Sequence, residues 1–229
     1  GDVVLEENRL IEQQHVLLLA NVGCATVNVI RKPKVLVIST GTEIKTNHTE
    51  LLQSGDVHNS NCQYLVSALE QMGCEQLDPW TIPDTKNLLQ RAFQDALSVE
   101  PPVDVIITIG GISRGAADFV PHIISQIGGD FLFRGVNLRP GKPVLASSFG
   151  DKSTLHFGLP GNPLAVLATF QAIVAPYIRV LQGRSITSPE MKVLGCELRQ
   201  DPNLTKFLLA KCLVNNTGDS DTVLPINNQ

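Results

Sequence analysis

Turns that combine glycine with hydroxyl and carboxylate groups are the parts of this sequence best suited to binding a ligand. The first has the sequence Ser-Thr-Gly-Thr-Glu at residues 39–43. Gly41 permits a close backbone approach, the hydroxyl of Thr40 offers a hydrogen-bond donor, and Glu43 adds a carboxylate. Taken alone, the same residues equally suit a plain turn that carries a satisfied acid.

A longer turn, Gly-Gly-Ile-Ser-Arg-Gly-Ala-Ala-Asp at residues 110–118, has the composition of an anion-binding loop. Gly110, Gly111 and Gly115 let main-chain N–H groups converge on an anion, and the N-terminus of a following helix adds a favourable dipole. The alternative is a tight strand-to-helix turn in which Asp118 caps the helix or favours its first turn.

A stiff basic loop follows at residues 139–143, with the sequence Arg-Pro-Gly-Lys-Pro. Pro140 and Pro143 restrict its backbone, and Arg139 and Lys142 place two cations around Gly141. Such a loop suits a phosphate group or another oxyanion. Standing alone, it would more often be a solvated surface turn.

Two other positions have both a structural and a functional interpretation. Asp84 precedes an amphipathic segment, so it suits a helix N-cap, and its carboxylate equally suits a divalent cation. The sequence Leu-Pro-Gly-Asn-Pro at residues 159–163 leads into a long apolar segment. Asn162 as N-cap and Pro163 at the first helical position would explain that motif without any ligand.

The elements around these turns alternate between strands and helices. Continuous apolar runs at residues 35–38 and 103–109 predict strands covered on both faces. Helical spacing of apolar residues predicts helices over residues 65–72, 88–97 and 119–127. The first of these would be capped by Asn59, Ser60 or Asn61 and end at Gly73.

Further strands are expected near residues 131–138, 144–147 and 155–158, followed by a buried helix over residues 164–181 that is kinked at Pro176. Together these elements predict a three-layer α/β domain with a mostly parallel sheet over residues 33–183. In open parallel sheets, ligands bind where strands end and helices begin, and the turns described above lie there.

The two flanks differ from this domain. Residues 1–32 read as the remnant of a preceding domain, in which residues 16–29 would supply two short strands broken at Gly23. Residues 184–229 lose the helical periodicity, and strands at residues 192–198 and 206–214, joined by a turn at residues 201–203, predict part of a C-terminal β domain.

Composition excludes several classes of protein. The 229 residues are 43% hydrophobic and 17% charged, which is typical of a soluble globular protein. The net charge of -4 and scattered cations argue against nucleic-acid binding. The early apolar run is too short for a membrane span, and the acidic start is unlike a signal peptide, so a cytoplasmic protein is expected. The five cysteines and five histidines show no zinc-site spacing.

Four motifs in one order resemble the MoeA and gephyrin E-domain family. They are Ser-Thr-Gly-x-Glu from residue 39, Gly-Gly-x-Ser-x-Gly-x-x-Asp from residue 110, Pro-Gly-Lys-Pro from residue 140 and Leu-Pro-Gly-Asn-Pro from residue 159. The resemblance covers residues 33–183, and the flanks resemble neighbouring parts of the same proteins. Each motif alone is weak, and the four in sequence make an accidental match very improbable.

The resemblance implies a MogA-like molybdopterin-binding domain and a molybdotransferase activity. Molybdate would be inserted into adenylylated molybdopterin, with dependence on Mg²⁺ and release of AMP. Glu43, Asp84 and Asp118 would handle Mg²⁺ and the pyrophosphate, and Arg139 and Lys142 would attract phosphate or molybdate. The pterin or its phosphate would be held by the remaining motif residues, which are Thr40, Gly41, Gly110, Gly111, Ser113, Gly115, Pro140 and Gly141.

Some positions depart from the family pattern. Thr42 stands where the family usually has Asp, and Asn59 stands where an acid commonly precedes the Ser60-Asn61 pair. Arg134-Gly135 is shifted against the usual basic position of the family. The family also forms a homodimer in which an N-terminal region, almost entirely missing from this sequence, contributes to the active site across the interface. These departures imply less negative charge at the metal site.

Two other functions fit the same resemblance. One is the related MogA-type adenylyltransferase, which adenylylates molybdopterin and could also be a partner, although the Leu-Pro-Gly-Asn-Pro motif and the trailing β domain argue against that activity here. The other is a non-catalytic binding or scaffold domain, as in gephyrin, where this domain anchors a partner peptide.

Overall fold

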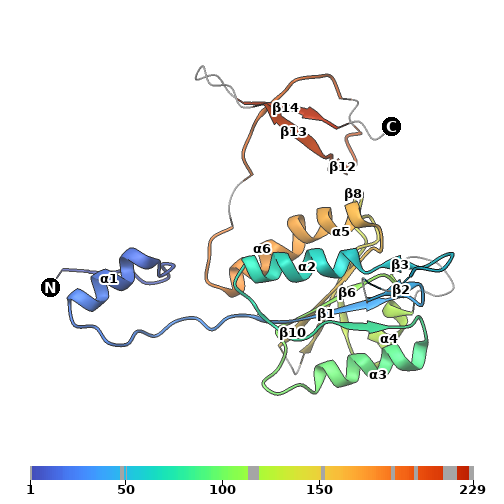
Figure 1. The fold of residues 1–229 in the computed structure, drawn as a ribbon, viewed down its shortest axis with the longest axis horizontal. Helices are drawn as coiled ribbons and strands as arrows, with labels where there is room; N and C mark the ends of the chain where they lie inside the picture. The colour runs from blue at the N-terminus through green and yellow to red at the C-terminus, as the bar shows by residue number, and fades with distance from the viewer. Residues whose placement is uncertain are drawn as a thin grey trace.

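The computed structural model describes residues 2–46, 49, 51–112, 119–150, 153–186, 189–198, 201–213 and 221–226. Most of them form an α/β body on one mixed sheet with the strand order β4-β1-β6-β10-β9-β7, and β5 also pairs with β1 (Figure 1). The strands of this sheet are β1 (Lys34–Thr40), β4 (Glu75–Gln76), β5 (Trp80–Ile82), β6 (Val105–Ile109), β7 (Asp130–Arg134), β9 (Leu145–Phe149) and β10 (Thr154–Leu159).

The central strands are parallel and buried, as their apolar sequences predict. Every residue of β1 and β6 is buried, and β6 pairs in parallel with β1 on one side and β10 on the other. Because both faces of these strands are covered, their sequences are continuous apolar runs rather than alternating patterns. The parallel pairing brings the carboxyl ends of all three strands to one edge of the sheet.

The far side of the sheet is antiparallel and irregular. β9 pairs antiparallel with β10 and with β7. In the β7–β9 pair, Phe131 lies opposite Ser147 and Phe133 lies opposite Ala146, so Leu132 is an extra residue. This β-bulge changes which face of the sheet the following residues occupy.

Helices cover both faces of the sheet, which confirms the predicted three-layer α/β fold (Figure 1). On one face, Leu65 and Leu69 of α2 (Ser60–Gln71) pack with Val166 of α5 (Pro163–Thr169) and Ile178 of α6 (Ala175–Leu181). The other face is covered by α3 (Lys86–Leu97) and α4 (Val120–Gln126), which bury the side chains Leu89, Ala92, Phe93, Ala96, Val120, Ile123 and Ile124.

The segment Pro163–Leu181 is one continuous helical stretch, and by length and composition alone it could cross a membrane. Its side chains instead pack on the sheet, with Phe170, Val174 and Ile178 fully buried or nearly so. A π-helical turn, η2 (Phe170–Val174), separates α5 from α6, and Ala175 N donates to Phe170 O. Pro176 therefore lies just beyond the π-helical turn, in the first turn of α6.

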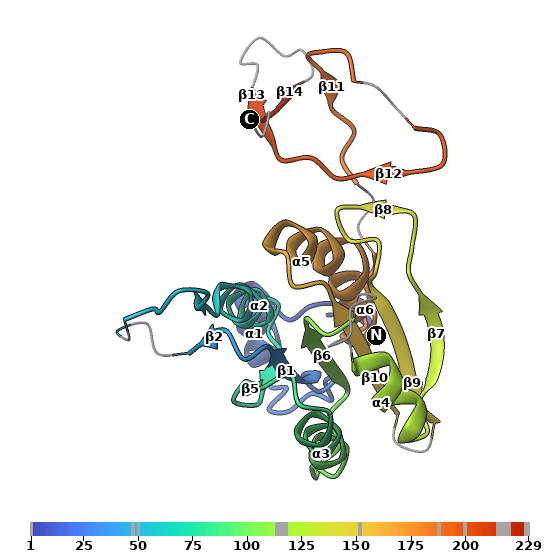
Figure 2. The same ribbon diagram turned by 90° about the vertical axis from the view of Figure 1, so that its right-hand side faces the viewer.

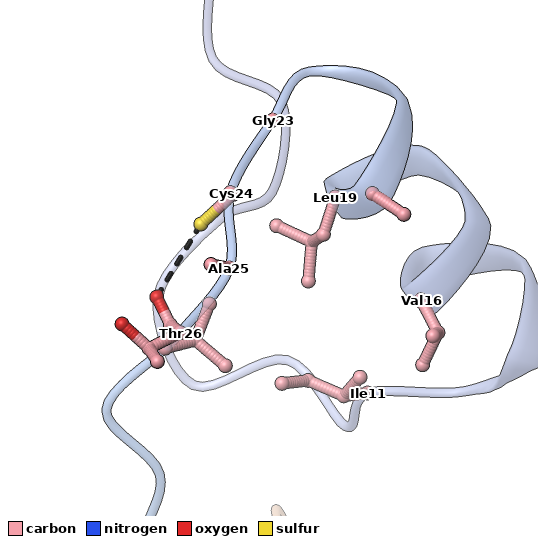
Figure 3. Close-up of a pocket in the computed structure, with 9 residues that line it drawn as sticks. Ile11, Val16, Leu19, Gly23, Cys24, Ala25 and Thr26 are labelled. Carbon is pink, nitrogen blue, oxygen red and sulfur yellow. Dashed lines mark hydrogen bonds between the residues drawn. The ribbon is translucent and has the colours of Figure 1, made fainter.

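The N-terminal segment contradicts the prediction of two short strands. Residues Gln13–Asn21 form a helix, α1, and in the described residues 24–33 no strand follows. The leucines and alanine at positions 17–20 are good helix formers, and they outweigh the β-branched Val16. α1 buries none of its residues. It lies apart from the α/β body (Figure 1), and Ile11, Val16 and Leu19 line a pocket of about 500 Å³ between the helix and the flanking chain (Figure 3).

The described residues of the C-terminal segment form short strands, as expected, and contact the α/β body at β8. A small sheet has the order β11-β14-β13. Separately, β12 (Thr205–Lys206) pairs in parallel with β8 (Leu138–Arg139) of the body, beside which it lies in Figure 2. The small sheet consists of β11 (Val193–Leu194), β13 (Ala210–Leu213) and β14 (Thr222–Pro225), of which β14 was not predicted.

Candidate functional site

The turns that follow β1 and β6 meet at the carboxyl edge of the sheet. Thr40 Oγ1 donates to Ile109 O at 3.1 Å, which ties the two strand ends together. Gly110 has φ +88°, and a Cβ built there would lie 2.9 Å from Thr40 Oγ1. Gly110 N in turn donates to Leu159 O at the end of β10. The glycine is therefore required by a left-handed backbone and by the close approach of two turns.

A small pocket of about 160 Å³ opens at this edge, and it is called the acidic pocket because Glu43 and Asp84 line it. The neighbouring short pair of β2 (Ile44–Lys45) and β3 (Val57–His58) forms part of its wall. Residues that sequence reasoning singled out meet here from separate turns: Thr40, Glu43, Asp84, Gly110 and Gly111.

Glu43 folds back over the turn that precedes it. A Cβ built on Gly41, which has φ +152°, would lie 2.7 Å from Glu43 Oε1, so the carboxylate lies over the glycine and would have to move if a side chain were present there. The backbone of Glu43 is fixed as well, because Val57 N donates to Glu43 O at 2.9 Å. The side chain is exposed to solvent, so its carboxylate is accessible to a ligand.

Asp84 is not the N-cap of the helix that follows it. That position belongs to Thr85, since α3 begins at Lys86. The expectation of a capping Asp84 is therefore wrong by one residue. Asp84 is instead half-buried at the wall of the acidic pocket, on the connection from β5 to α3.

Asn59 has a structural role at the base of the same pocket. It is the N-cap of α2, and its Oδ1 accepts from Cys62 N at 3.3 Å. Its Nδ2 donates to Ser39 Oγ at 3.0 Å and to Thr81 Oγ1 at 3.3 Å, so its amide links three segments. Burial raises the pKa of the Cys62 thiol, although a hydrogen bond with Ser39 opposes this effect. That thiol is therefore a neutral structural group beside the site.

The Leu-Pro-Gly-Asn-Pro motif caps a helix and also lines the acidic pocket. Asn162 caps α5, because its Oδ1 accepts from Leu164 N at 3.0 Å and from Ala165 N at 3.3 Å. Gly161 lines the acidic pocket, and its carbonyl accepts from Asn61 Nδ2 at 2.8 Å. The motif thereby connects the start of α5 to the start of α2.

A second, larger pocket has a volume of about 900 Å³, and it is called the basic pocket because Arg134 and Lys142 line it. Its wall includes Ile112, which directly follows Gly111 of the acidic pocket. Consecutive residues of the glycine turn therefore line two pockets of opposite charge. None of the described residues that line the basic pocket is acidic.

The basic loop contributes unequally to this arrangement. Lys142 lines the basic pocket, whereas Arg139, Pro140 and Gly141 are not among the described residues that line either charged pocket. Arg139 is exposed in β8, where its carbonyl accepts from Phe207 N at 2.9 Å. Three other predicted site residues, Ser113, Gly115 and Asp118, lie outside the described residues.

The donor set of the acidic pocket suits a hard cation that keeps part of its water shell. Within the described part of the chain, no cluster of three or more His, Cys, Asp or Glu side chains is placed to hold a metal. Two carboxylates in one pocket fit Mg²⁺, which is usually bound by one or two carboxylates together with water and ligand phosphates. The neighbouring cations of the basic pocket fit an oxyanion.

Sequence reasoning missed several residues that line the two pockets. His58 and Asn61 line the acidic pocket, and Asn137 lines the basic pocket. His58 belongs to a two-residue strand, which is too short to produce a recognisable alternation. Arg134 was noted only as a displaced basic residue, because its orientation depends on a bulge that the sequence does not reveal.

Comparison with known proteins gives consistent matches. A family described as "Probable molybdopterin binding domain" matches residues 36–180. A molybdopterin molybdenumtransferase from Haemophilus influenzae is 37% identical over 185 residues, which is 80% of this chain and 44% of that protein. The protein of the same name from Staphylococcus aureus is 32% identical over 229 residues, 98% of this chain and 52% of that protein.

Solved structures match in the same way. The molybdopterin biosynthesis MoeA protein from Pyrococcus horikoshii has a TM-score of 0.74 and 26% identity, and the match covers 98% of this chain and 53% of that one. A molybdopterin biosynthesis protein from Mycobacterium abscessus has a TM-score of 0.52 and 16% identity over 66% of this chain and 94% of that one, a likeness of fold alone. The chain spans about half the length of the curated relatives it matches.

Proposed function

Because this chain belongs to the molybdopterin-binding domain family, we propose that it is the ligand-binding part of a molybdopterin molybdenumtransferase. In this proposal the chain binds adenylylated molybdopterin, and molybdate is inserted into the pterin with release of AMP. The curated relatives that carry this name are about twice as long as the chain. The proposal therefore concerns the part of the reaction that this domain performs.

The observation that carries the proposal is the pairing of two pockets of opposite charge across one glycine turn. Glu43, Asp84 and Gly110-Gly111 line one pocket, and Arg134 and Lys142 line the other together with Ile112, the residue that follows Gly111. An adenylylated pterin has a pyrophosphate that needs a cation, and the incoming molybdate is an anion. The two pockets supply the matching charges at neighbouring positions.

Mg²⁺ is part of the proposal, and Glu43 and Asp84 are the described residues that would hold it. When bound, the ion would neutralise phosphate charge and polarise the bond to the adenylate. The residues of the chain act by positioning. Thr40 Oγ1 ties the end of β1 to the end of β6, and the amide of Asn59 ties the start of α2 to β1 and β5. The turns that carry Glu43 and Asp84 therefore start from strand ends that are fixed by buried hydrogen bonds.

A direct test is titration of the chain with adenylylated molybdopterin, with and without Mg²⁺, followed by calorimetry and by measurement of AMP release on addition of molybdate. We expect Glu43→Gln and Asp84→Asn each to weaken the Mg²⁺-dependent binding about tenfold or more, because each removes a charged ligand. The matched control is Glu70→Gln, at an exposed position near the end of α2. Absence of any binding by the unmodified chain would contradict the proposal.

The same assay separates the competing activities. If the chain adenylylated molybdopterin at the expense of ATP, the MogA-type function would replace the proposed one. If Glu43→Gln and Asp84→Asn left molybdenum insertion by the full-length protein intact, the pockets would serve binding alone, as in a scaffold domain.

The proposal also includes a homodimer. Its support is the apolar surface of α1, on which Val16, Leu17 and Leu18 are 58%, 74% and 40% exposed. Such a surface is seldom left in water when it forms a continuous patch. Analytical ultracentrifugation over a range of concentrations would measure the association directly, and a strictly monomeric protein would contradict this part of the proposal.

A further inference from the structure

We propose that Arg134, rather than Arg139 of the basic loop, acts with Lys142 to bind the anionic group in the basic pocket. This inference rests on the proposed function and deepens it by naming a residue that determines where the anion is held. Its ligand is a tetrahedral oxyanion, which is either the incoming molybdate or a phosphate group of the pterin ligand.

The β-bulge at Leu132 is the feature that places Arg134 in the pocket. In a regular strand, residues three positions apart lie on opposite faces. Because Leu132 is an extra residue, Phe131 and Arg134 lie opposite Ser147 and Leu145, which occupy the same face of β9. Leu145 and Ile112 belong to the core on that face and line the basic pocket. The bulge therefore turns Arg134 toward the pocket.

A contact within β7 confirms this orientation and restrains the guanidinium. The Cζ atom of Arg134 lies 4.8 Å from the centroid of the Phe131 ring. An arginine that stacks on an aromatic ring loses fewer conformations when it binds a ligand. The planar guanidinium also presents paired N–H donors, which match an oxyanion better than a single ammonium group does.

Arg139 occupies a different environment, although it belongs to the motif. It pairs with Lys206 across the β8–β12 contact and is exposed there. A second cation at the neighbouring strand position makes this part of the surface basic without enclosing an anion. Lys142, three residues further along the loop, returns to the basic pocket, where Val136 N donates to its carbonyl at 2.9 Å.

The experiment is calorimetric titration of the full chain with sodium molybdate and, in a separate arm, with inorganic phosphate. We expect Arg134→Gln to weaken anion binding about tenfold or more, the loss typical of one charge-assisted hydrogen-bonded group. Arg134→Lys should restore part of the affinity, because it keeps the charge without the paired donors. Arg91→Gln, at an 80% exposed side chain of α3, is the control for a change of net charge alone.

A comparison of two arginines decides between the alternatives. A smaller loss for Arg139→Gln than for Arg134→Gln supports the inference, and an equal or larger loss overturns it. An unmodified chain that binds neither anion also overturns it. If the Arg134 effect appears only with molybdate, the site holds the incoming molybdate; if it appears only with phosphate, the site holds a phosphate of the pterin ligand.

A deletion tests the role of the bulge itself. Removing Leu132 takes out the extra residue but leaves Phe133 opposite Ala146 and Arg134 opposite Leu145, so Arg134 should stay at the pocket and anion affinity should be retained. A loss as large as that of Arg134→Gln would show that the strand register does not place this side chain. If this deletion unfolds the chain, the comparison of the Arg134→Gln and Arg139→Gln variants still shows which arginine binds the anion. Pterin binding by the Glu43 and Asp84 variants is measured separately. A failure of the proposed function can therefore be told apart from a failure of this inference.

Discussion

The glycine at position 110 determines the geometry of the site more than any charged residue does. It is held between Thr40 Oγ1 and the end of β10, and its backbone has a positive φ. Any side chain at this position would push apart the two turns that carry the acidic pocket. The absence of a Cβ at Gly110 therefore lets the turn after β6 approach the turn that leads to Glu43.

Gly110→Ala is therefore expected to lower the free energy of unfolding by about 1–3 kcal/mol, through the strained backbone and the contact with Thr40. Chemical denaturation monitored by circular dichroism would measure the change. Gly161→Ala is the matched control, because Gly161 lines the same pocket but a Cβ there meets no atom within 4 Å. Equal effects of the two substitutions would show that the turn tolerates a side chain.

For single residues, the sequence predicted the kind of ligand chemistry better than it predicted which residues line the pockets. Glu43, Asp84 and Gly110 were selected from turn composition, and the structure places them around one pocket. Arg139 was selected from its motif, whereas Arg134 lines the basic pocket. Motif spacing locates residues along a loop, but it does not show how a bulge in a neighbouring strand reorients a side chain.

Two helices that border the site, α2 and α5, begin at side-chain caps, and α5 offers the clearer test of one. Asn162→Ala should destabilise the protein by about 1 kcal/mol, because two main-chain donors at the start of α5 lose their acceptor. Asn162→Asp keeps an acceptor at the same position and should retain the stability. Thermal or chemical unfolding would measure both variants. If Asn162→Asp keeps its stability but loses ligand binding, the asparagine has a function beyond capping.

His156 links three strands beneath the site. Its Nε2 lies 2.9 Å from Thr108 Oγ1 of β6, and its Nδ1 lies 3.1 Å from Ser147 Oγ of β9. The ring is fully buried against Phe93, and burial lowers the pKa of His156 to about 3. The folded protein therefore keeps this imidazole neutral over the whole physiological range.

This buried histidine predicts a dependence of stability on pH. Below its usual pKa of about 6.5 the histidine of the unfolded chain binds a proton, while His156 in the folded protein does not until about pH 3. Stability should therefore be lost as pH falls below about 6.5, by up to about 1.4 kcal/mol per pH unit. Denaturation of the wild type and His156→Gln at pH 7 and pH 5 would isolate this contribution. Parallel losses in the two proteins would contradict it.

Long, strongly patterned elements could be predicted from the sequence, and short or isolated ones could not. The buried runs of β1 and β6 and the apolar stripes of α2 and α3 match their predictions closely. The strands β4 and β5 have only two and three residues, and they exist because β1 offers them a pairing edge. α1 was mistaken for a strand because its short apolar run at residues 16–20 also suits β structure, although local helix propensity determined the outcome.

The buried residues are distributed very unevenly over the molecule. The two hydrophobic clusters lie within the α/β body. By contrast, α1 buries none of its residues, and every residue of β11 and β13 is exposed. Because burial of apolar surface is the main source of stability, nearly all of the free energy of folding should come from the α/β body.

This distribution predicts that the N-terminal segment can be removed at little cost. At protein concentrations low enough to keep the chain monomeric, deleting residues 2–29 should change the free energy of unfolding by less than about 0.5 kcal/mol, as expected for segments without buried contacts. The variant keeps Arg31, whose Nη1 and Nη2 each donate to Asp104 at 2.6 Å. It also keeps Ile30, which lies close to Gly183. Chemical denaturation and light scattering after size exclusion would measure stability and mass together.

The matched variant Arg31→Gln shows how much stability the ion pair of Arg31 with Asp104 contributes, separately from the contribution of α1. It removes a bidentate ion pair to a carboxylate whose side chain is only 17% exposed, and it should cost up to about 1 kcal/mol, more than the whole deletion. A deletion that costs more than Arg31→Gln, with no change in mass, would mean that α1 packs on the α/β body in solution. A deletion that lowers both stability and mass would instead mean that the apolar side chains of α1 are buried between two copies of the chain, since only association makes stability depend on protein concentration.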